Sequence, residues 1–348
     1  MQEIKTVEMH TGGEPLRIVV AGYPEVKGHT LLEKRRYVKN HLDVWRKRLM
    51  LEPRGHSDMY GALIVTPNHP DADIAVLFLH NEGYSTMCGH GVIALGRYIV
   101  DNKLNQSKPI PVPDSLTKMN VPVVIQCPCG IVRAFVDVEN GKSESVSFIS
   151  VPGFSLCNDF SLITPSFGEV IIDVAYGGAF YALVNVNQLG LSLETTPVAN
   201  LTAAADEISK SVRSSGLDIN HPDDVDDEKD LSFLYGTILT DDQNQVLSRN
   251  LCVFADREVD RSPCGSGVTA QIIVQYAKGL IKQGQMKKFQ NAKTKSIFTG
   301  EVAEEVLNYS SSKYDMVRVK VTGKAHYTGK AKFIFENEDP LVDGFRLQ

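Results

Sequence analysis

A seven-residue sequence occurs twice in this chain, and this repeat constrains the fold more than any other feature. CGHGVIA at residues 88–94 recurs as CGSGVTA at residues 264–270, with five of the seven positions identical. The spacing of 264 − 88 = 176 residues is about half of the 348-residue chain. A chain of this length exceeds the usual size of one hydrophobic core. The repeat therefore predicts two similar domains, each presenting one cysteine from a matching turn.

Short runs rich in Val, Ile, Phe and Tyr predict β-strands along most of the chain, because Gly, Pro, Asn or Asp usually bounds them. Apolar residues at helical spacing predict fewer helices, at 31–50, 91–104, 200–216 and 267–281. Long series of strands interrupted by single helices favour an α+β fold over a regularly alternating parallel sheet. The proline-rich stretch at 106–114 predicts a surface loop.

Composition and charge exclude several classes of partner. The net charge of −6 argues against a nucleic acid or an anionic membrane, since both favour a basic surface. The first residues carry no basic segment followed by an apolar run, and no apolar run approaches the ~18 residues of a membrane span. Six cysteines are too few for a disulfide scaffold. We expect a cytoplasmic protein with reduced thiols, acting on a small molecule and assembled as a homodimer. The acidic run at 221–230 predicts a solvated loop.

The two repeated cysteines stand where a thiol is most easily activated. Cys88 and Cys264 each precede a Gly-x-Gly and then an apolar helix. Glycine permits backbone geometry in which successive N–H groups converge on an anion. The first N–H groups of a helix lack intrahelical partners and carry the positive end of its dipole. A carboxylate can therefore dock there, and a thiol there has a lowered pKa.

The other cysteines are expected to be small buried residues without a catalytic role. The C-x-C pair in QCPCG has no second Cys or His pair at the spacing of a zinc site, so it predicts no metal centre. These four residues are Cys127, Cys129, Cys157 and Cys252.

Two thiols on matching domains suggest a two-base reaction at a stereocentre. One thiolate takes a proton from a carbon, the opposite thiol returns one, and the helix N–H groups hold the substrate carboxylate. A non-catalytic or redox thiol protein is the alternative of a different class. Exchange of solvent protons into the substrate α-carbon distinguishes the two, because a binding or redox protein shows none.

The motifs MCGHG and DRSPCGSG resemble the two signatures of the proline racemase family. Further matches are MHTGGEPLRIV at 9–19, LEPRGHSDMYGA at 51–62, IDVAYGGAFYA at 172–182 and GKAHYTG at 323–329. The resemblance implies a diaminopimelate epimerase-like fold. In that fold, two pseudo-symmetric domains each wrap a β-sheet around a central helix, with the active site between them and neither pyridoxal phosphate nor metal. We expect an N-terminal domain at 1–163, completed by 334–348, and a C-terminal domain at 164–333.

The same resemblance implies roles for individual residues. Cys88 and Cys264 are the catalytic pair. His90 and Asp260 hold the ring nitrogen of the substrate. The amides of Gly89, Gly265 and Ser266 hold its carboxylate, and Tyr60 and Ser85 line the pocket.

The family contains proline racemases, 4-hydroxyproline 2-epimerases and trans-3-hydroxy-L-proline dehydratases. The first two need both thiols, whereas the dehydratases usually carry Thr or Ser in place of the second. Cys264 therefore favours cofactor-independent racemisation or 2-epimerisation of proline or hydroxyproline. Flanking segments such as FLHNEGYSTMCGHGVIALGRY and NLCVFADREVDRSP instead resemble animal-type dehydratases. Dehydration is thus the alternative, and the two activities are compatible because both begin with proton removal by Cys88.

Overall fold

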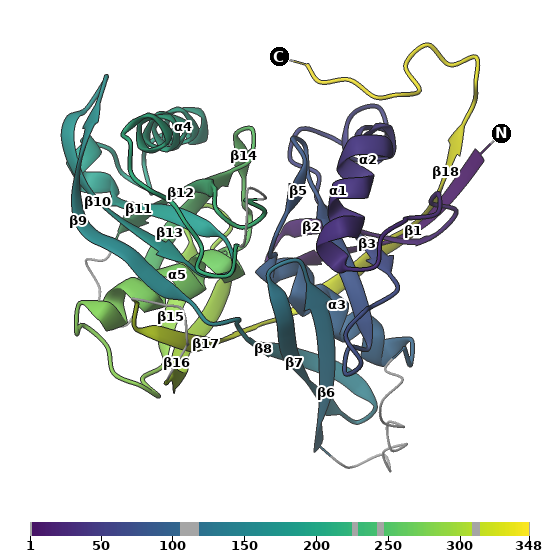
Figure 1. The fold of residues 1–348 in the computed structure, drawn as a ribbon, viewed down its shortest axis with the longest axis horizontal. Helices are drawn as coiled ribbons and strands as arrows, with labels where there is room; N and C mark the ends of the chain where they lie inside the picture. The colour runs from purple at the N-terminus through teal and green to yellow at the C-terminus, as the bar shows by residue number, and fades with distance from the viewer. Residues whose placement is uncertain (1, 105–117, 225–228, 242–246, 308–313, 348) are drawn as a thin grey trace. The chain divides into compact units, whose positions relative to one another are not determined.

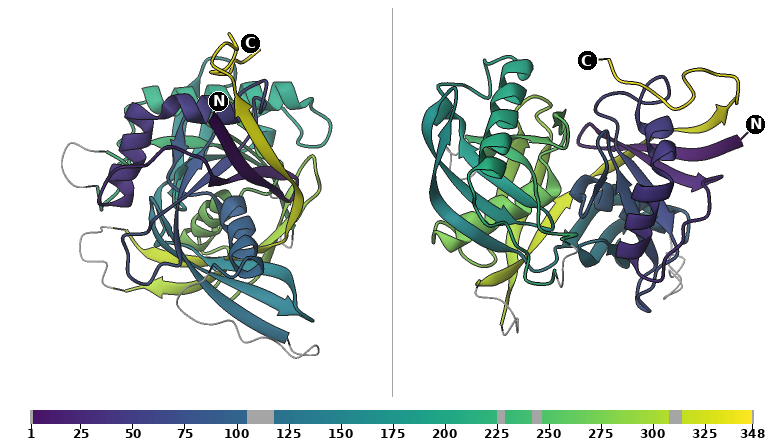
Figure 2. Two further views of the ribbon diagram at one scale, coloured as in Figure 1. Left: turned by 90° about the vertical axis from the view of Figure 1, so that its right-hand side faces the viewer. Right: turned by 45° about the horizontal axis from the view of Figure 1, so that its top comes forward.

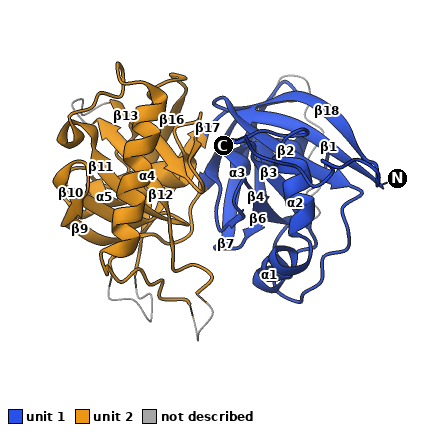
Figure 3. Ribbon diagram, turned by 90° about the horizontal axis from the view of Figure 1, so that it is seen from above, with its two compact units in different colours: residues 1–148, 323–348 blue, residues 149–322 orange. Residues whose placement is uncertain are grey.

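The computed structural model divides into two compact units, coloured separately in Figure 3. Unit 1 comprises residues 1–148 and 323–348, and unit 2 comprises residues 149–322. The structure describes residues 2–104, 118–224, 229–241, 247–307 and 314–347. The proline-rich stretch at 106–114 and part of the acidic run at 221–230 lie outside these residues.

Unit 1 contains one continuous ladder of strands (Figure 1). Its strands are β1 (Gln2–Thr11), β2 (Glu14–Ala21), β3 (Gly61–Val65), β4 (Ile74–Leu79), β5 (Tyr84–Ser85), β6 (Lys118–Cys127), β7 (Gly130–Glu139), β8 (Lys142–Ile149) and β18 (Ala325–Phe335). The ladder runs β18-β1-β2-β3-β4-β6-β7, with β2/β3 and β4/β6 parallel and the other pairs antiparallel. The strands β1 and β18, from opposite ends of the chain, run side by side (Figure 2).

Unit 2 repeats this pattern with its own strands. They are β9 (Phe154–Thr164), β10 (Gly168–Tyr176), β11 (Phe180–Asn185), β12 (Leu234–Asp241), β13 (Leu247–Phe254), β14 (Glu258–Val259), β15 (Lys287–Asn291), β16 (Ile297–Val306) and β17 (Met316–Gly323). The ladder β9-β10-β11-β12-β13-β15-β16 has the same succession of parallel and antiparallel pairs as unit 1, and β17 continues it. The 176-residue repeat is therefore a repeat of topology as well as of sequence.

Strand pairing explains which unit is joined by the strands that lie next to the two boundaries between the units. The strand β9 pairs with β10 of unit 2, and β18 pairs with β1 of unit 1. Residues 149–163 are accordingly grouped with unit 2 and residues 323–333 with unit 1. Both boundaries thus lie N-terminal to the expected 163/164 and 333/334, because strand pairing places β9 in unit 2 and β18 in unit 1.

Each unit wraps its sheet around one apolar helix. The helices are α3 (Gly89–Asp101) and α5 (Gly265–Ala277), and each begins directly after a repeated cysteine. In unit 1, α3 contacts β18, β1, β2, β6 and β7, whereas in unit 2 α5 contacts β9, β10, β11 and β16. Nearly every residue of both helices is buried, as expected for helices that are apolar all round.

The remaining helices connect parallel strands. The helices α1 (Leu31–His41) and α2 (Asp43–Met50) lie between β2 and β3, and α4 (Val198–Ser214) lies between β11 and β12. The sequence predicts one helix over 31–50, but the non-helical backbone at Leu42, with φ −126° and ψ 12°, divides it. Thr30 and Glu33 form a capping box that starts α1. None of the helices within the described ranges is long and apolar enough to cross a membrane.

A second repeat brings a Gly-Gly turn against each central helix. HTGG at 10–13 joins β1 to β2, and AYGG at 175–178 joins β10 to β11. In unit 1 the Thr11 hydroxyl donates to the His90 carbonyl at 2.9 Å. In unit 2 a Cβ on Gly177 would lie 2.4 Å from the Ser266 carbonyl oxygen. The corresponding carbonyls of α3 and α5 are therefore packed by the same turn.

Replacing Gly177 with Ala should destabilise unit 2 by about 1–3 kcal/mol, because the new methyl group meets backbone atoms that cannot rotate away. The clashes are with the Ser266 carbonyl oxygen at 2.4 Å and the Ala270 nitrogen at 2.8 Å. Urea unfolding measures the loss. Gly329→Ala is the control, since a Cβ there meets nothing within 4 Å. Equal midpoints for the two variants would contradict the close approach.

Candidate functional site

Cys88 lies at the N-cap of α3 with its thiol on the first turn. The Gly91 N–H donates to the Cys88 Sγ at 3.2 Å, and the residue is only 4% exposed. A Cβ on Gly91 would lie 2.8 Å from that sulfur and 2.9 Å from the Phe78 ring. Glycine is therefore required at position 91, because a side chain there would prevent the thiol from approaching the helix amide this closely. A hydrogen bond from a backbone N–H favours the thiolate over the thiol.

His90 packs against this thiol as a neutral imidazole. Its Nδ1 lies 3.3 Å from the Cys88 Sγ. Burial lowers the pKa of His90 to about 3, and a hydrogen bond with the Pro15 backbone opposes this shift only partly. A neutral imidazole has one N–H and one acceptor nitrogen. One of the two ring nitrogens of His90 is therefore an acceptor.

Tyr60 and Ser85 complete this cluster in unit 1. The Tyr60 hydroxyl and the Ser85 Oγ are hydrogen-bonded at 2.5 Å. The Tyr60 ring meets the His90 ring edge-on, with centroids 4.9 Å apart. Both Tyr60 and Ser85 are buried. The structure thus brings together every residue that the sequence assigned to this half of the site, while their contacts with substrate stay a prediction.

Cys264 occupies the same place in unit 2 with a different backbone geometry. It precedes α5 with φ +64°, a left-handed conformation that is uncommon for any residue except glycine. The Cys264 side chain does not cap α5. Its Sγ lies 3.7 Å from the Tyr181 hydroxyl and 3.9 Å from the Ser266 Oγ. The amides that begin α5, including those of Gly265 and Ser266, are therefore not occupied by the thiol.

Asp260 lies beside this turn as a buried carboxyl group. Burial raises the pKa of Asp260 to about 6, although hydrogen bonds from Ser262 and Cys264 work in the opposite direction. The Ser262 N–H donates to the Asp260 Oδ1 at 2.7 Å. Near neutral pH the group is still mostly ionised. It therefore places a negative charge in unit 2 close to Cys264.

Two asparagines hold the loop between Asp260 and Cys264. The Asn291 amide donates to the Asp260 carbonyl at 2.8 Å and to the Ser262 carbonyl at 2.9 Å. The Asn250 amide donates to the Pro263 carbonyl at 2.9 Å. Sequence reasoning missed both, because they lie on β15 and β13 and carry no local motif.

Tyr181 is the other residue that sequence reasoning missed. Its hydroxyl is hydrogen-bonded to the Ser266 Oγ at 2.7 Å. Tyr181 is the second residue of the strand after the Gly-Gly turn, as Pro15 is in unit 1. Tyr181 is three residues after Gly178, whereas Pro15 is two residues after Gly13, so the Gly-Gly repeat alone leads to the neighbouring Phe180. In each unit, this strand position therefore contacts the residue at the centre of the Gly-x-Gly, His90 or Ser266.

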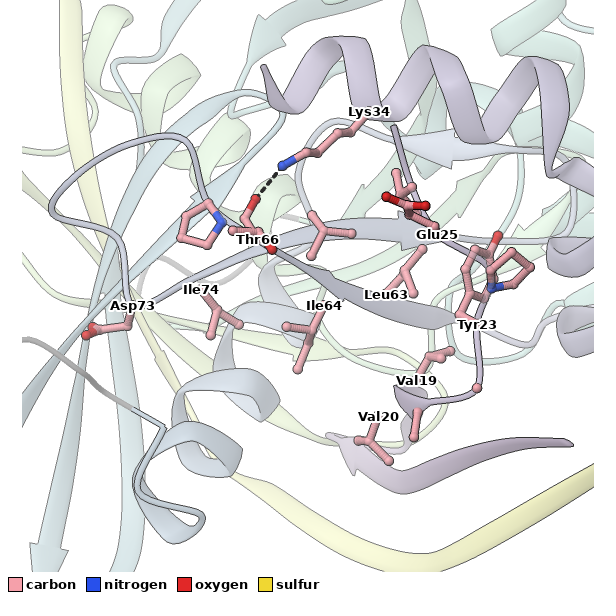
Figure 4. Close-up of a pocket in the computed structure, with 16 residues that line it drawn as sticks. Val19, Val20, Tyr23, Glu25, Lys34, Leu63, Ile64, Thr66, Asp73 and Ile74 are labelled. Carbon is pink, nitrogen blue, oxygen red and sulfur yellow. Dashed lines mark hydrogen bonds between the residues drawn. The ribbon is translucent and has the colours of Figure 1, made fainter. Parts of the chain in front are cut away.

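A groove of about 610 Å³ in unit 1 is separate from these residues (Figure 4). It is lined by β2, the loop after it, β3 and α1, and the Lys34 ammonium donates to the Thr66 carbonyl at 2.6 Å at its edge. Its lining includes neither Cys88 nor His90. Among the residues that the structure describes, no cluster of three His, Cys, Asp or Glu side chains is arranged to hold a metal ion.

Replacing Asn291 with Ala should destabilise the protein by about 2 kcal/mol, because two buried carbonyls lose their donor. The midpoint of urea unfolding measures this effect. Gln290→Ala is the matched control, since the neighbouring Gln290 amide bonds only an exposed carbonyl, that of Lys295. An Asn291→Ala variant as stable as the control would contradict a clamping role.

Comparison with known proteins identifies the family. A family model described as proline racemase matches residues 6–346. Trans-3-hydroxy-L-proline dehydratase of Homo sapiens and trans-L-3-hydroxyproline dehydratase of Bos taurus are each 51% identical to this chain, over 99% of it and 95% of the relative. The crystal structure of a hydroxyproline epimerase from Agrobacterium vitis, with bound trans-4-hydroxy-L-proline, matches with a TM-score of 0.88. It is 25% identical and covers 100% of this chain and 95% of its own. The expected diaminopimelate epimerase-like fold is confirmed, and the chain belongs to the proline racemase family.

Proposed function

We propose that this protein exchanges the α-proton of proline or hydroxyproline through two cysteines, as a racemase or 2-epimerase. One observation carries the proposal: a thiol stands at the start of the central helix in both units. A racemase needs one base for each face of the α-carbon, and two equivalent thiols supply them.

Proton removal is assigned to the Cys88 thiolate for the L-substrate. The Gly91 N–H at 3.2 Å stabilises the charged sulfur before the proton moves. The carbon–hydrogen electrons pass into the α-carbon and its carboxylate. The Cys264 thiol then donates its proton to the opposite face, which inverts the centre and leaves Cys88 protonated. The reverse reaction exchanges the two roles.

The substrate carboxylate is assigned to the amides of Gly89, Gly265 and Ser266. Developing charge on that carboxylate is stabilised by N–H groups that are already oriented. Because the Cys264 side chain does not cap α5, the amides of Gly265 and Ser266 suit an anionic ligand.

The ring nitrogen is assigned to His90 and Asp260. A proline ring nitrogen is a secondary ammonium with two N–H donors. A neutral imidazole offers an acceptor nitrogen, and an ionised carboxylate offers both an acceptor and a charge. Tyr60 and Ser85 are proposed to border the ring, where a hydroxyl substituent would meet them.

Dehydration of trans-3-hydroxy-L-proline is a second candidate, favoured by the 51% identity to dehydratases over 99% of the chain. Here Cys88 removes the α-proton and hydroxide leaves the β-carbon. The resulting enamine tautomerises to a cyclic imine, so water is the other product. The second thiol is not required, and both activities are compatible on one chain.

The cellular setting is part of the proposal. All six cysteines are free thiols, which agrees with a reducing, cytoplasmic compartment. We propose a homodimer that acts on a small molecule, without nucleic acid or membrane as partner. Light scattering coupled to size exclusion tests the dimer.

Incubation in deuterated water with L-proline, trans-4-hydroxy-L-proline or trans-3-hydroxy-L-proline tests the reaction. We expect α-deuteration, which mass spectrometry measures, together with inversion, which optical rotation measures. Cys264→Thr should reduce inversion at least ~100-fold and keep any imine formation, whereas Cys88→Ser should lose both. Cys157→Ser is the control, because this thiol lies on β9 and belongs to neither Gly-x-Gly turn. Imine from the 3-hydroxy substrate without any inversion would overturn the two-base reaction.

The catalytic rate should fall as the pH is lowered through about 6. Burial raises the pKa of Asp260 to about 6, so the ionised carboxylate dominates only above that pH. Below it the group becomes neutral and loses its attraction for the ammonium. We expect kcat/KM to fall about tenfold per pH unit below this point. Asp260→Asn should lower kcat/KM and remove this acidic limb of the pH–rate profile, while any limb of the profile above pH 7 persists. A variant that keeps the limb near pH 6 would contradict the assignment.

A further inference from the structure

Cys127 and Cys129 frame the two-residue turn between β6 and β7, so the two cysteines stand two positions apart on one tight hairpin. Cys127 ends β6, pairs with Gly130 in the ladder and is 2% exposed. Cys129 lies on the turn and is half-buried. Nothing in the proposed function uses this pair.

The turn lies directly against the loop that carries Cys88. The Cys129 N–H donates to the Thr86 carbonyl at 3.1 Å, two residues before the catalytic cysteine. In unit 2 the Asn291 amide donates to the Ser262 carbonyl, two residues before Cys264. Cys127 and Asn291 are the last residues of the matching strands β6 and β15. The end of this strand therefore supports the cysteine loop in both units, through a side chain in one and a backbone N–H in the other.

We propose that Cys127 and Cys129 are a redox modification site, which a low-molecular-weight disulfide such as oxidised glutathione converts to an intrachain disulfide. The Cys129 thiolate attacks the small disulfide and releases one small thiol. The Cys127 sulfur then attacks the mixed disulfide at Cys129 and releases the second. Two protein thiols become one disulfide, and their two protons leave on the two small thiols.

The order of the two steps follows from burial. Cys129 is accessible to an oxidant from the turn, whereas Cys127 is covered. Burial raises the pKa of Cys127 well above its ordinary value, and the neighbouring thiols of Cys129 and Cys88 add to this shift. Cys127 thus stays protonated until a mixed disulfide forms beside it, and it acts as the resolving thiol.

Oxidation of this pair changes the support of Cys88. A disulfide holds the Cβ atoms of its two cysteines about 3.8 Å apart. Because Cys127 is fixed in the ladder, the turn has to adjust to the disulfide, and we expect the bond from the Cys129 N–H to the Thr86 carbonyl to weaken. The segment from Thr86 to Cys88 loses this support, and the bond between the Gly91 N–H and the Cys88 Sγ is weakened. Loss of catalytic rate on oxidation rests on the proposed function, whereas the disulfide itself does not.

Thiol mapping tests the site without any assay of activity. The full chain is titrated with oxidised glutathione, remaining thiols are blocked with N-ethylmaleimide, and peptides are analysed by mass spectrometry. We expect a Cys127–Cys129 disulfide to form before any disulfide that includes Cys88, and Cys129→Ser to abolish it. Both thiols still alkylated, or a first disulfide at Cys88, would overturn the proposal.

Alkylation of Cys88 by iodoacetamide tests the coupling. In the oxidised protein we expect this rate to fall about two- to fivefold, the effect of weakening a helix-terminus interaction with the thiolate. Oxidised glutathione should leave the rate unchanged in Cys129→Ser, whose backbone N–H to Thr86 is retained. Cys157→Ser should respond as the wild type does. An unchanged rate in wild-type protein that contains the disulfide would overturn the coupling while leaving the redox site in place.

Discussion

The contact between a cysteine sulfur and the first turn of a buried helix organises this protein. In unit 1 the sulfur is 3.2 Å from the Gly91 N–H, and only a residue without a Cβ permits that approach. In unit 2 a Cβ on Gly267 would likewise lie 2.9 Å from the Cys264 sulfur. A helix that is apolar on every side must be enclosed. The wrapped sheet of each unit meets that requirement.

The two half-sites share a topology but differ in electrostatics. His90 in unit 1 corresponds to Ser266 in unit 2, and burial keeps the imidazole neutral. The thiol of unit 1 caps its helix, whereas the thiol of unit 2 does not and lies among hydroxyl groups. The buried carboxyl group of Asp260 lies beside the second. A substrate with one carboxylate and one ammonium is itself asymmetric, so a duplicated frame with unequal side chains suits it.

Much of this arrangement can be predicted from the sequence, and the rest depends on contacts distant along the chain. The seven-residue motif that occurs twice locates both thiols and the starts of α3 and α5, because a Gly-x-Gly before an apolar run is a local signal. Asn291 contacts Ser262 from another strand, so no local pattern reveals it. The neutral state of His90 depends on burial, which composition does not show. The strands β9 and β18 are assigned to a unit by pairing, which the order of elements leaves open.

The surroundings of Cys264 explain how one-base and two-base reactions can share this frame. The Tyr181 and Ser266 hydroxyls lie within 3.9 Å of the sulfur, and they bond to each other at 2.7 Å. Such groups can donate to or accept from a hydroxyl as readily as a thiol. A threonine at this position would therefore keep its polar partners and leave the loop clamp of Asn291 and Asn250 intact. The reacting group loses its acidity, because a hydroxyl does not ionise near neutral pH and cannot return a proton as a thiol does. Under the proposed function, the side chain at position 264 therefore decides which reaction this chain catalyses, while Cys88 and its helix supply the step common to both.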